Sequence, residues 1–138
     1  MKSRGTLIRL KRFQVDEKRR HVAQIEFMIA DFERMMVDLD REIMYEQEKA
    51  GIHDESHFAY PTFARAAKNR RDNLKASADE LREQLKEAQA ALGEAFEELK
   101  KVELLEERDL SNARAEANAR DQAMMDDIGI RNHSKRVS

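Results

Sequence analysis

Residues 22–43 read VAQIEFMIADFERMMVDLDREI, and their apolar side chains carry the clearest fold signal in the chain. These side chains recur at alternating steps of three and four residues, at Val22, Ile25, Ile29, Phe32, Met36, Leu39 and Ile43. The spacing lays one apolar stripe along one face of an α-helix, as in a coiled-coil seam. A second seam follows at Leu74, Ala78, Leu81, Leu85, Ala88, Leu92, Ala95, Leu99 and Val102.

The segment between the two seams contains signals that end one helix and begin another. Gly51 can adopt the left-handed backbone that often closes a helix, and Pro61 suits a first helical turn. Two helices joined by a short connection run antiparallel. We therefore predict an all-α fold, a two-helix antiparallel coiled-coil rod in a single domain over residues 1–138. The expected bounds are about 4–50 for the first helix, 51–58 for the turn, 59–128 for the second helix and 129–138 for a frayed tail.

Blocks of charge favour the same pairing, although the net charge is only −2. Residues 1–20 carry eight Lys or Arg against two acidic residues, and the following stretch to residue 58 is strongly acidic. With a turn centred near residue 56, the acidic stretch 31–48 faces the basic residues of 65–82. The basic N-terminal block then faces glutamates between residues 94 and 107. Opposite charges beside a seam fix helix orientation, and the second helix overhangs beyond about residue 110.

The composition fits long helices rather than a rounded core, with 39% charged residues, four glycines and one proline. Cysteine is absent, which excludes disulfides and thiolate chemistry. No stretch has the length of a signal peptide's apolar region or the roughly 18 apolar residues of a membrane span. We expect a cytoplasmic protein without direct membrane insertion.

Motifs for catalysis and cofactor binding are missing from the sequence. It holds no glycine-rich phosphate loop, no nucleophile elbow and no HExxH, so we expect no enzymatic activity and no cofactor. His53 and His57 are four residues apart in the turn, where a solvated loop is a simpler interpretation than a metal site. The basic N-terminal block lacks aromatic stacking partners, so nucleic acid is not an expected ligand.

Two regions are candidates for docking proteins. The turn gathers Tyr45, Phe58, Tyr60 and Phe63, which either close the core of the hairpin or form an exposed hot spot. The open end combines apolar and basic residues of both termini: Leu7, Arg9, Leu10, Arg12, Met124, Met125 and Ile128. The basic N-terminal block either docks a partner or only balances the negative charge of the second helix.

Three stretches resemble the FliJ family of flagellar export proteins. They are LIRLKRFQVDEKRRHVAQIE at residues 7–26, FAYPTF at 58–63 and ARDQAMMDDI at 119–128. The last stretch is similar to the family's ending, DQxxMDE followed by an apolar residue, at Asp121, Gln122, Met125, Asp126, Asp127 and Ile128. Pro61 between the tip aromatics departs from the family pattern.

The resemblance implies a stalk in the central pore of the hexameric flagellar export ATPase that also touches the export-gate protein FlhA at the inner membrane. It further implies an escort role for substrate-specific export chaperones. On this basis Tyr45, Tyr60 and Phe63 are expected at the gate, and the seven residues of the open end are expected at the ATPase. The alternative is a generic structural or oligomerising coiled coil, or the stalk of a virulence-type secretion system.

Overall fold

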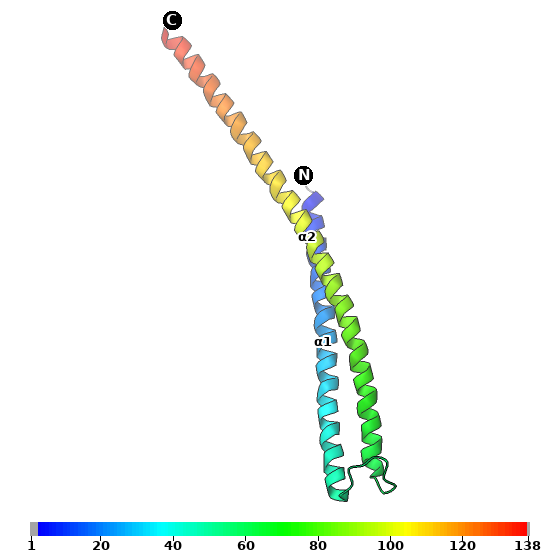
Figure 1. Cartoon of the computed structure of the whole chain (residues 1–138). Coiled ribbons are helices and arrows are strands. Elements are labelled where there is room, and N and C mark those ends of the chain that lie inside the picture. The colour runs from blue at the N-terminus through cyan, green and yellow to red at the C-terminus, as the bar shows by residue number, and fades with distance from the viewer. Residues whose placement is uncertain (1–2, 138) are drawn as a thin grey trace. The chain divides into compact units, whose positions relative to one another are not determined.

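The computed structural model describes residues 3–137, which form two long helices and one connection (Figure 1). Helix α1 is Ser3–Ala50 and helix α2 is Thr62–Val137. The two helices pack against each other in antiparallel orientation, and no strand occurs among the described residues. The predicted all-α, two-helix coiled-coil fold is confirmed.

Contacts divide the chain into two units. The hairpin unit is Phe13–Ala95, and the terminal unit is Met1–Arg12 together with Phe96–Ser138. The hairpin unit contains the connection and most of the two seams. The terminal unit contains the described beginning of α1 and the C-terminal part of α2.

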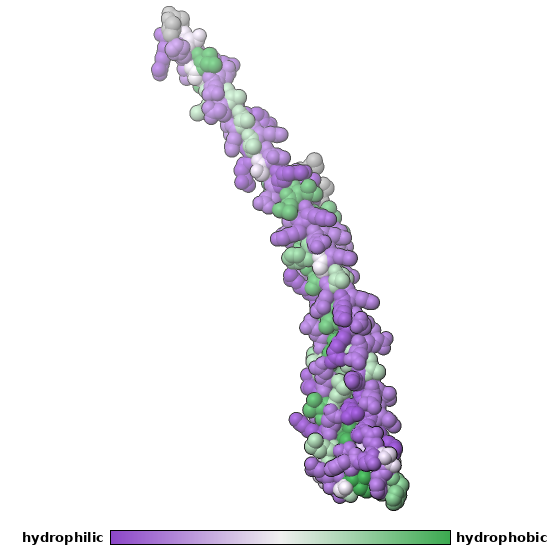
Figure 2. All heavy atoms as spheres, viewed as in Figure 1, coloured by the Kyte–Doolittle hydropathy of each residue, from purple (hydrophilic) through white to green (hydrophobic). Residues whose placement is uncertain are grey.

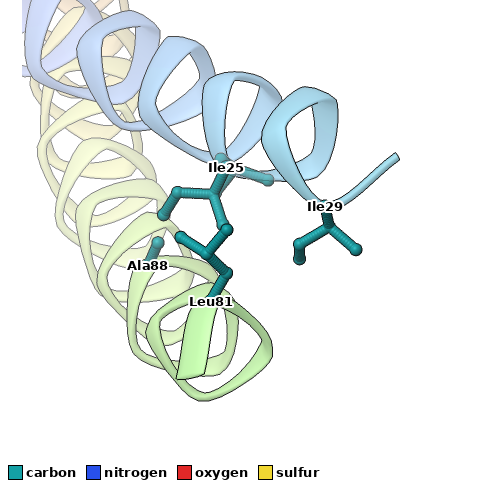
Figure 3. Packing of buried hydrophobic residues seen from close by; sticks show 5 residues of the cluster. Ile25, Ile29, Leu81 and Ala88 are labelled. Atoms are coloured by element: carbon teal, nitrogen blue, oxygen red, sulfur yellow. The ribbon is translucent and has the colours of Figure 1, made fainter. Parts of the chain in front are cut away.

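The core of the hairpin unit is a line of seam residues between α1 and α2. Ile25 and Ile29 of α1 lie in one buried cluster with Leu81 and Ala88 of α2 (Figure 3). A second cluster joins Leu39 and Ile43 with Ala67, nearer the connection. Every predicted seam residue of α1 is buried or half-buried, and so is every predicted seam residue of α2. The sequence periodicity therefore identified both buried faces.

The α2 side of this core is built largely from alanine. Ala64 and Ala78 are 0% exposed. Ala67, Ala88 and Ala95 are also buried. Small side chains let two helix backbones approach closely, so the larger residues of α1 fill most of the space between the helices. Ala64 and Ala67 extend the seam toward the connection by two positions that the sequence analysis did not include.

Ion pairs across the helices agree with the predicted antiparallel register. In the hairpin unit, Asp40 pairs with Arg71 at 3.0 Å and Glu33 pairs with Arg82 at 2.6 Å. In the terminal unit, Lys11 pairs with Glu98 at 2.8 Å. These groups are substantially exposed, so each pair selects an orientation more than it adds stability.

The end of α1 is closed by a backbone motif centred on Gly51. Gly51 has a φ of 72°, the left-handed conformation that glycine adopts most readily. Its N–H donates to the carbonyls of Gln47 at 2.9 Å and Glu48 at 3.2 Å, and the N–H of Ile52 donates to Gln47 at 3.3 Å. This is the Schellman arrangement, which satisfies carbonyl groups at the helix end.

Helix α2 begins at Thr62, three residues after the predicted start. A proline disfavours helical backbone in the residue before it, which keeps Tyr60 out of the helix. The N–H of Tyr60 instead donates to the carbonyl of His57 at 3.0 Å, in a turn. The carbonyl of Pro61 accepts the N–H of Arg65 at 3.1 Å and so starts the helical hydrogen-bond pattern.

The other end of α2 also differs from the prediction, because the helix continues through Gly129 to Val137. The predicted frayed tail at 129–138 is therefore helical as far as the structure describes it, and Ser138 lies outside the described residues. An ion pair between Asp127 and Arg131 at 3.1 Å spans Gly129 on one helix face. Lys135 and Arg136 occupy the last turn, where their positive charge interacts favourably with the negative end of the helix dipole.

Candidate protein-docking surfaces

Neither described helix contains an apolar stretch that would cross a bilayer. Across residues 3–137, no three metal-binding side chains gather into a cluster that could hold a metal ion. His57, one of the two histidines of the connection, accepts the N–H of Ala59 on Nδ1 at 3.0 Å. This hydrogen bond uses the Nδ1 atom of the imidazole within its own loop.

The connection is held by short-range hydrogen bonds. Asp54 accepts the N–H of Ser56 at 3.0 Å and its hydroxyl at 2.7 Å. These two bonds lower the pKa of the Asp54 carboxyl. Glu55 reaches forward to α2, where its carbonyl accepts a hydrogen bond from Arg65 at 3.1 Å and its carboxylate pairs with Lys68. The loop is therefore folded onto the start of α2.

Tyr60 is the anchor of this tip. Its side chain is 4% exposed, and its hydroxyl accepts a hydrogen bond from the amide of Gln47 at 2.9 Å. The charged groups of Arg65 and Lys68 each lie 5.5 Å from the centre of its ring, within cation–π range. Tyr60 thus closes the hairpin core, which corrects its assignment to an exposed binding surface.

The other aromatic residues of the tip are exposed. Phe58 is 96% exposed and stacks on His57 with ring centres 4.8 Å apart. Phe63 and Tyr45 are more than half exposed, and the Lys49 ammonium lies 6.0 Å from the Tyr45 ring. The aromatic cluster is therefore divided: Tyr60 lies in the core, and the other three side chains lie on the surface. The exposed tip set is Tyr45, Phe58 and Phe63.

The terminal unit divides the basic N-terminal block into paired and unpaired charges. Arg12 pairs with Glu103 at 3.2 Å, and Arg4 pairs with Asp109. Arg9 makes no ion pair within residues 3–137 and donates only to the carbonyl of Gly5, at 3.4 Å. Leu7 and Leu10 are both more than a third exposed. The block thus partly balances the negative charge of α2, and within the terminal unit Arg9 is the described basic residue of α1 that has no acidic partner on residues 3–137.

Beyond Asp109, every residue of α2 from Leu110 to Arg136 is exposed. The pattern of apolar residues nevertheless continues on one helix face, which we call the terminal stripe: Leu110, Ala113, Ala117, Met124 and Ile128. Helical spacing places this stripe on the same side of α2 as Leu99 and Val102, which are buried and half-buried. The face that packs within the terminal unit therefore runs on without a covering helix.

The extended part of α2 has its own local contacts. Gln122 donates to Asp126 at 3.1 Å along the helix surface. Met125 lies beside the terminal stripe and, with Ile130 and His133, borders a shallow hollow over Gly129. Figure 2 shows hydrophobic side chains scattered among hydrophilic ones toward the C-terminal end. The predicted residues Met124, Met125 and Ile128 are all exposed, as a docking role requires.

One surface feature has no counterpart among the residues predicted from the sequence. Met35 of α1 and Asn73 of α2 border an open groove beside the seam, with Leu39, Leu74, Arg70 and Ser77. Its volume is about 310 Å³. Methionines next to seam positions, such as Met28 and Met35, are the sequence signal for such a groove, because they flank the core without entering it.

Comparison with protein families gives a match that covers nearly the whole chain. A family model described as "Flagellar FliJ protein" matches residues 2–138. No curated protein and no solved structure gives a significant match.

Proposed function

The chain belongs to the flagellar FliJ family, and from this premise we propose that it is a stalk that binds the flagellar export ATPase through its terminal unit and the export gate through its tip. Family membership indicates a coiled-coil protein related to flagellar export. The assignment of one surface to each partner is our proposal. It includes a cytoplasmic location beside the export gate at the inner membrane.

The observation that carries the ATPase assignment is the terminal stripe. A helix of more than twenty exposed residues with an apolar face is a surface suited to a partner. The central pore of a hexameric ring can surround such a helix on all sides. Arg9 adds positive charge near this end, where it would favour approach to an acidic pore wall.

The direct test is truncation of α2. A chain ending after Glu116 lacks Met124, Met125 and Ile128, and we expect it to lose stimulation of the export ATPase while circular dichroism shows the remaining helices intact. A matched control chain ending after Arg131 keeps the terminal stripe and should stimulate normally. Undiminished stimulation by the shorter chain would refute the ATPase assignment.

The basic residues should act on the rate of association. The double substitution Arg9→Glu and Arg12→Glu should slow binding to the ATPase mainly at low salt, because salt screens charges beyond about 8–10 Å. Arg9→Glu alone should account for most of the change, since Arg12 already pairs with Glu103. If the association rate of the double variant depends on salt concentration as that of the unsubstituted chain does, these charges do not steer binding.

The exposed tip set supports the assignment of the gate protein FlhA to the connection. Exposed aromatic side chains are common anchors of protein interfaces, each contributing about 2 kcal/mol or more. The double substitution Tyr45→Ala and Phe63→Ala should weaken FlhA binding at least tenfold without loss of helicity. Escort of substrate chaperones is part of the proposed role, and the same purified variants serve to test it.

The terminal stripe also favours a second candidate, a coiled coil that associates with copies of itself. Sedimentation of the purified chain separates the two functions. A monomer that stimulates the ATPase supports the stalk function. A stable oligomer that no longer forms after Met124→Ser and Ile128→Ser would support self-association instead.

A further inference from the structure

The coiled-coil seam changes from apolar to charged residues within the terminal unit. On α1 the heptad line of Ile25 continues upstream with cations, at Lys18, Lys11 and Arg4. On α2 the seam continues beyond Val102, at steps of four and three, with the acids Glu106 and Asp109. A regular seam carries apolar side chains at such positions. Opposite charges therefore replace apolar pairs in the seam of this unit.

The structure places these charges between the helices rather than on a solvated face. Arg4, Lys11, Glu106 and Asp109 are all half-buried. Within the described residues of the unit, ion pairs join α1 to α2 as Arg4 with Asp109, Lys11 with Glu98 and Arg12 with Glu103. The side chains of Arg4 and Lys11 are 27% and 23% exposed. Their apolar stems thus lie against α2 while their charged ends reach its acids.

Little apolar surface is buried in the same unit. From Arg4 to Arg12 no residue is buried, and Ile8 is half-buried. On the described part of α2 in this unit, Leu99 is the one buried residue. Exposed ion pairs contribute little stability each, and a helix end without a packed core opens at low cost. The first turns of α1 are therefore held on α2 mainly by charge.

We propose that residues Ser3–Arg12, which we call the N-terminal arm, are a releasable cover on α2. The ion pairs at Glu98 and Asp109 place the arm over the stretch between them, which includes Val102. The arm is closed while its cations pair with α2, and it opens when salt or the charges of a partner replace those pairs. Opening joins this stretch of α2 to the terminal stripe, which begins at Leu110. The uncovered face is then longer than the terminal stripe alone.

Selection of the helix register does not by itself account for these charges. A polar seam residue fixes register at a cost in stability. In the hairpin unit, the pairs Asp40–Arg71 and Glu33–Arg82 already oppose a shifted register. Because α1 is one continuous helix, the charges of the arm add no further choice of register. What they change is the stability of one end of the seam.

Spin labels on the full-length chain test whether the arm opens. The chain has no cysteine, so Thr6→Cys and Glu107→Cys give one label on the arm and one on α2, both at exposed positions. Electron–electron resonance should show one narrow distance at about 0.1 M salt, and a second, longer and broader distance at about 1 M, where the screening length falls to about 3 Å. The same distance distribution at both salt concentrations would overturn the proposal.

Substitutions separate release of the arm from ordinary fraying of a helix end. Lys11→Leu gives the seam an apolar residue and should keep the arm closed at both salt concentrations. The matched control is Arg9→Leu, because Arg9 donates only to the carbonyl of Gly5 on its own helix. The control should open with salt as the unsubstituted chain does. Closure of the arm by both substitutions, or by neither, would overturn the proposal.

A charge exchange tests the pair at the end of the arm. Arg4→Glu should open the arm at low salt, because it sets a second acid beside Asp109. Arg4→Glu together with Asp109→Arg should close it again. An arm that stays closed in the single variant, or open in the double variant, would contradict control by this pair and overturn the proposal.

Hydrogen exchange measures the same opening without labels. Amides of residues 7–12 should exchange about fivefold faster or more at high salt, the change expected when ion pairs of this exposure are screened. Amides of residues 22–29, in the apolar seam, should exchange at the same rate at both salt concentrations. An equal acceleration in the two segments would show general destabilisation and overturn the proposal.

Stimulation of the export ATPase tests whether a partner uses the uncovered face, a step that rests on the proposed function. Lys11→Leu should need about tenfold more chain for half-maximal stimulation, because a smaller fraction of it is open and competent to bind. Half-maximal stimulation at the same concentration as the unsubstituted chain would refute competition between the arm and the ATPase. An unsubstituted chain that opens with salt but does not stimulate would refute the stalk function and support the arm as a cover.

Discussion

The side-chain amide of Gln47, in the last turn of α1, donates a hydrogen bond to the hydroxyl of Tyr60 just before α2, at 2.9 Å. This bond links the end of one helix to the start of the next across the connection. Because Tyr60 is also buried, its ring contributes apolar contact to the same junction. The tip is therefore a packed end of the core as well as a loop.

Substitutions at the tip should separate stability from binding. Tyr60→Ala should lower the free energy of unfolding by about 3 kcal/mol, because it empties a buried aromatic site. Tyr60→Phe should cost about 1 kcal/mol through the lost hydrogen bond. Phe63→Ala should change stability by less than about 0.5 kcal/mol, since Phe63 is exposed. Urea unfolding followed by circular dichroism measures all three, and similar values for Tyr60→Ala and Phe63→Ala would contradict the assignment of Tyr60 to the core.

The seam should dominate the stability of the hairpin unit. Leu81→Ala should cost about 2–5 kcal/mol, and Phe32→Ala should fall at the lower end of that range because Phe32 is only partly buried. Phe27→Ala serves as the matched control and should be nearly neutral, because Phe27 is an exposed residue of α1. Thermal melts would place the three variants in this order. A neutral Leu81→Ala would mean that the seam register is wrong.

Two glycines should respond in opposite directions to alanine. Gly51→Ala should destabilise the protein by about 1 kcal/mol, because a φ of 72° strains a residue with a Cβ. Gly93→Ala should stabilise it by about 0.5–1 kcal/mol, because Gly93 is helical and an added Cβ would meet no atom within 4 Å. Unfolding of the two variants side by side tests the prediction, which fails if both shift the same way.

The Lys11–Glu98 pair should make a small contribution that depends on pH. The hydrogen bond and charge of Lys11 lower the pKa of Glu98. A lowered pKa means that the stabilisation is complete above the ordinary glutamate value, about 4.3, and is lost as pH falls through the lower folded-state pKa. Lys11→Gln should raise the pKa of Glu98 toward its ordinary value, as NMR titration of the carboxyl would show. An unchanged titration curve would mean that the pair does not form in solution.

The burial of the periodic apolar residues is the feature that the sequence predicts well. Ile25, Leu81 and the other seam residues recur at steps of three and four, and burial follows directly from that spacing. Charge blocks then identified the antiparallel register, as the Asp40–Arg71 and Lys11–Glu98 pairs show. These features depend on local spacing and on long-range charge, both of which can be read without a structure.

Features that depend on a single contact were not predictable in this way. The burial of Tyr60 depends on how the connection folds against Gln47, and no repeat indicates it. The continuation of α2 through Gly129 depends on local helix contacts such as Asp127–Arg131 rather than on an apolar pattern. The division of the basic block between paired Arg12 and unpaired Arg9 likewise needs side-chain positions.

The alanines on the α2 side of the hairpin seam imply that α1 and α2 are sensitive to opposite changes in side-chain volume. At Ala64 and Ala78 a larger side chain would wedge the backbones apart, which typically costs about 1–3 kcal/mol. At Ile25 and Leu39 a smaller side chain would leave a void that the alanines cannot fill. In a library of random substitutions, surviving variants should therefore show an upper limit of side-chain size along α2 and a lower limit along α1, and a compensating pair would exchange a large residue on one helix for a small one on the other.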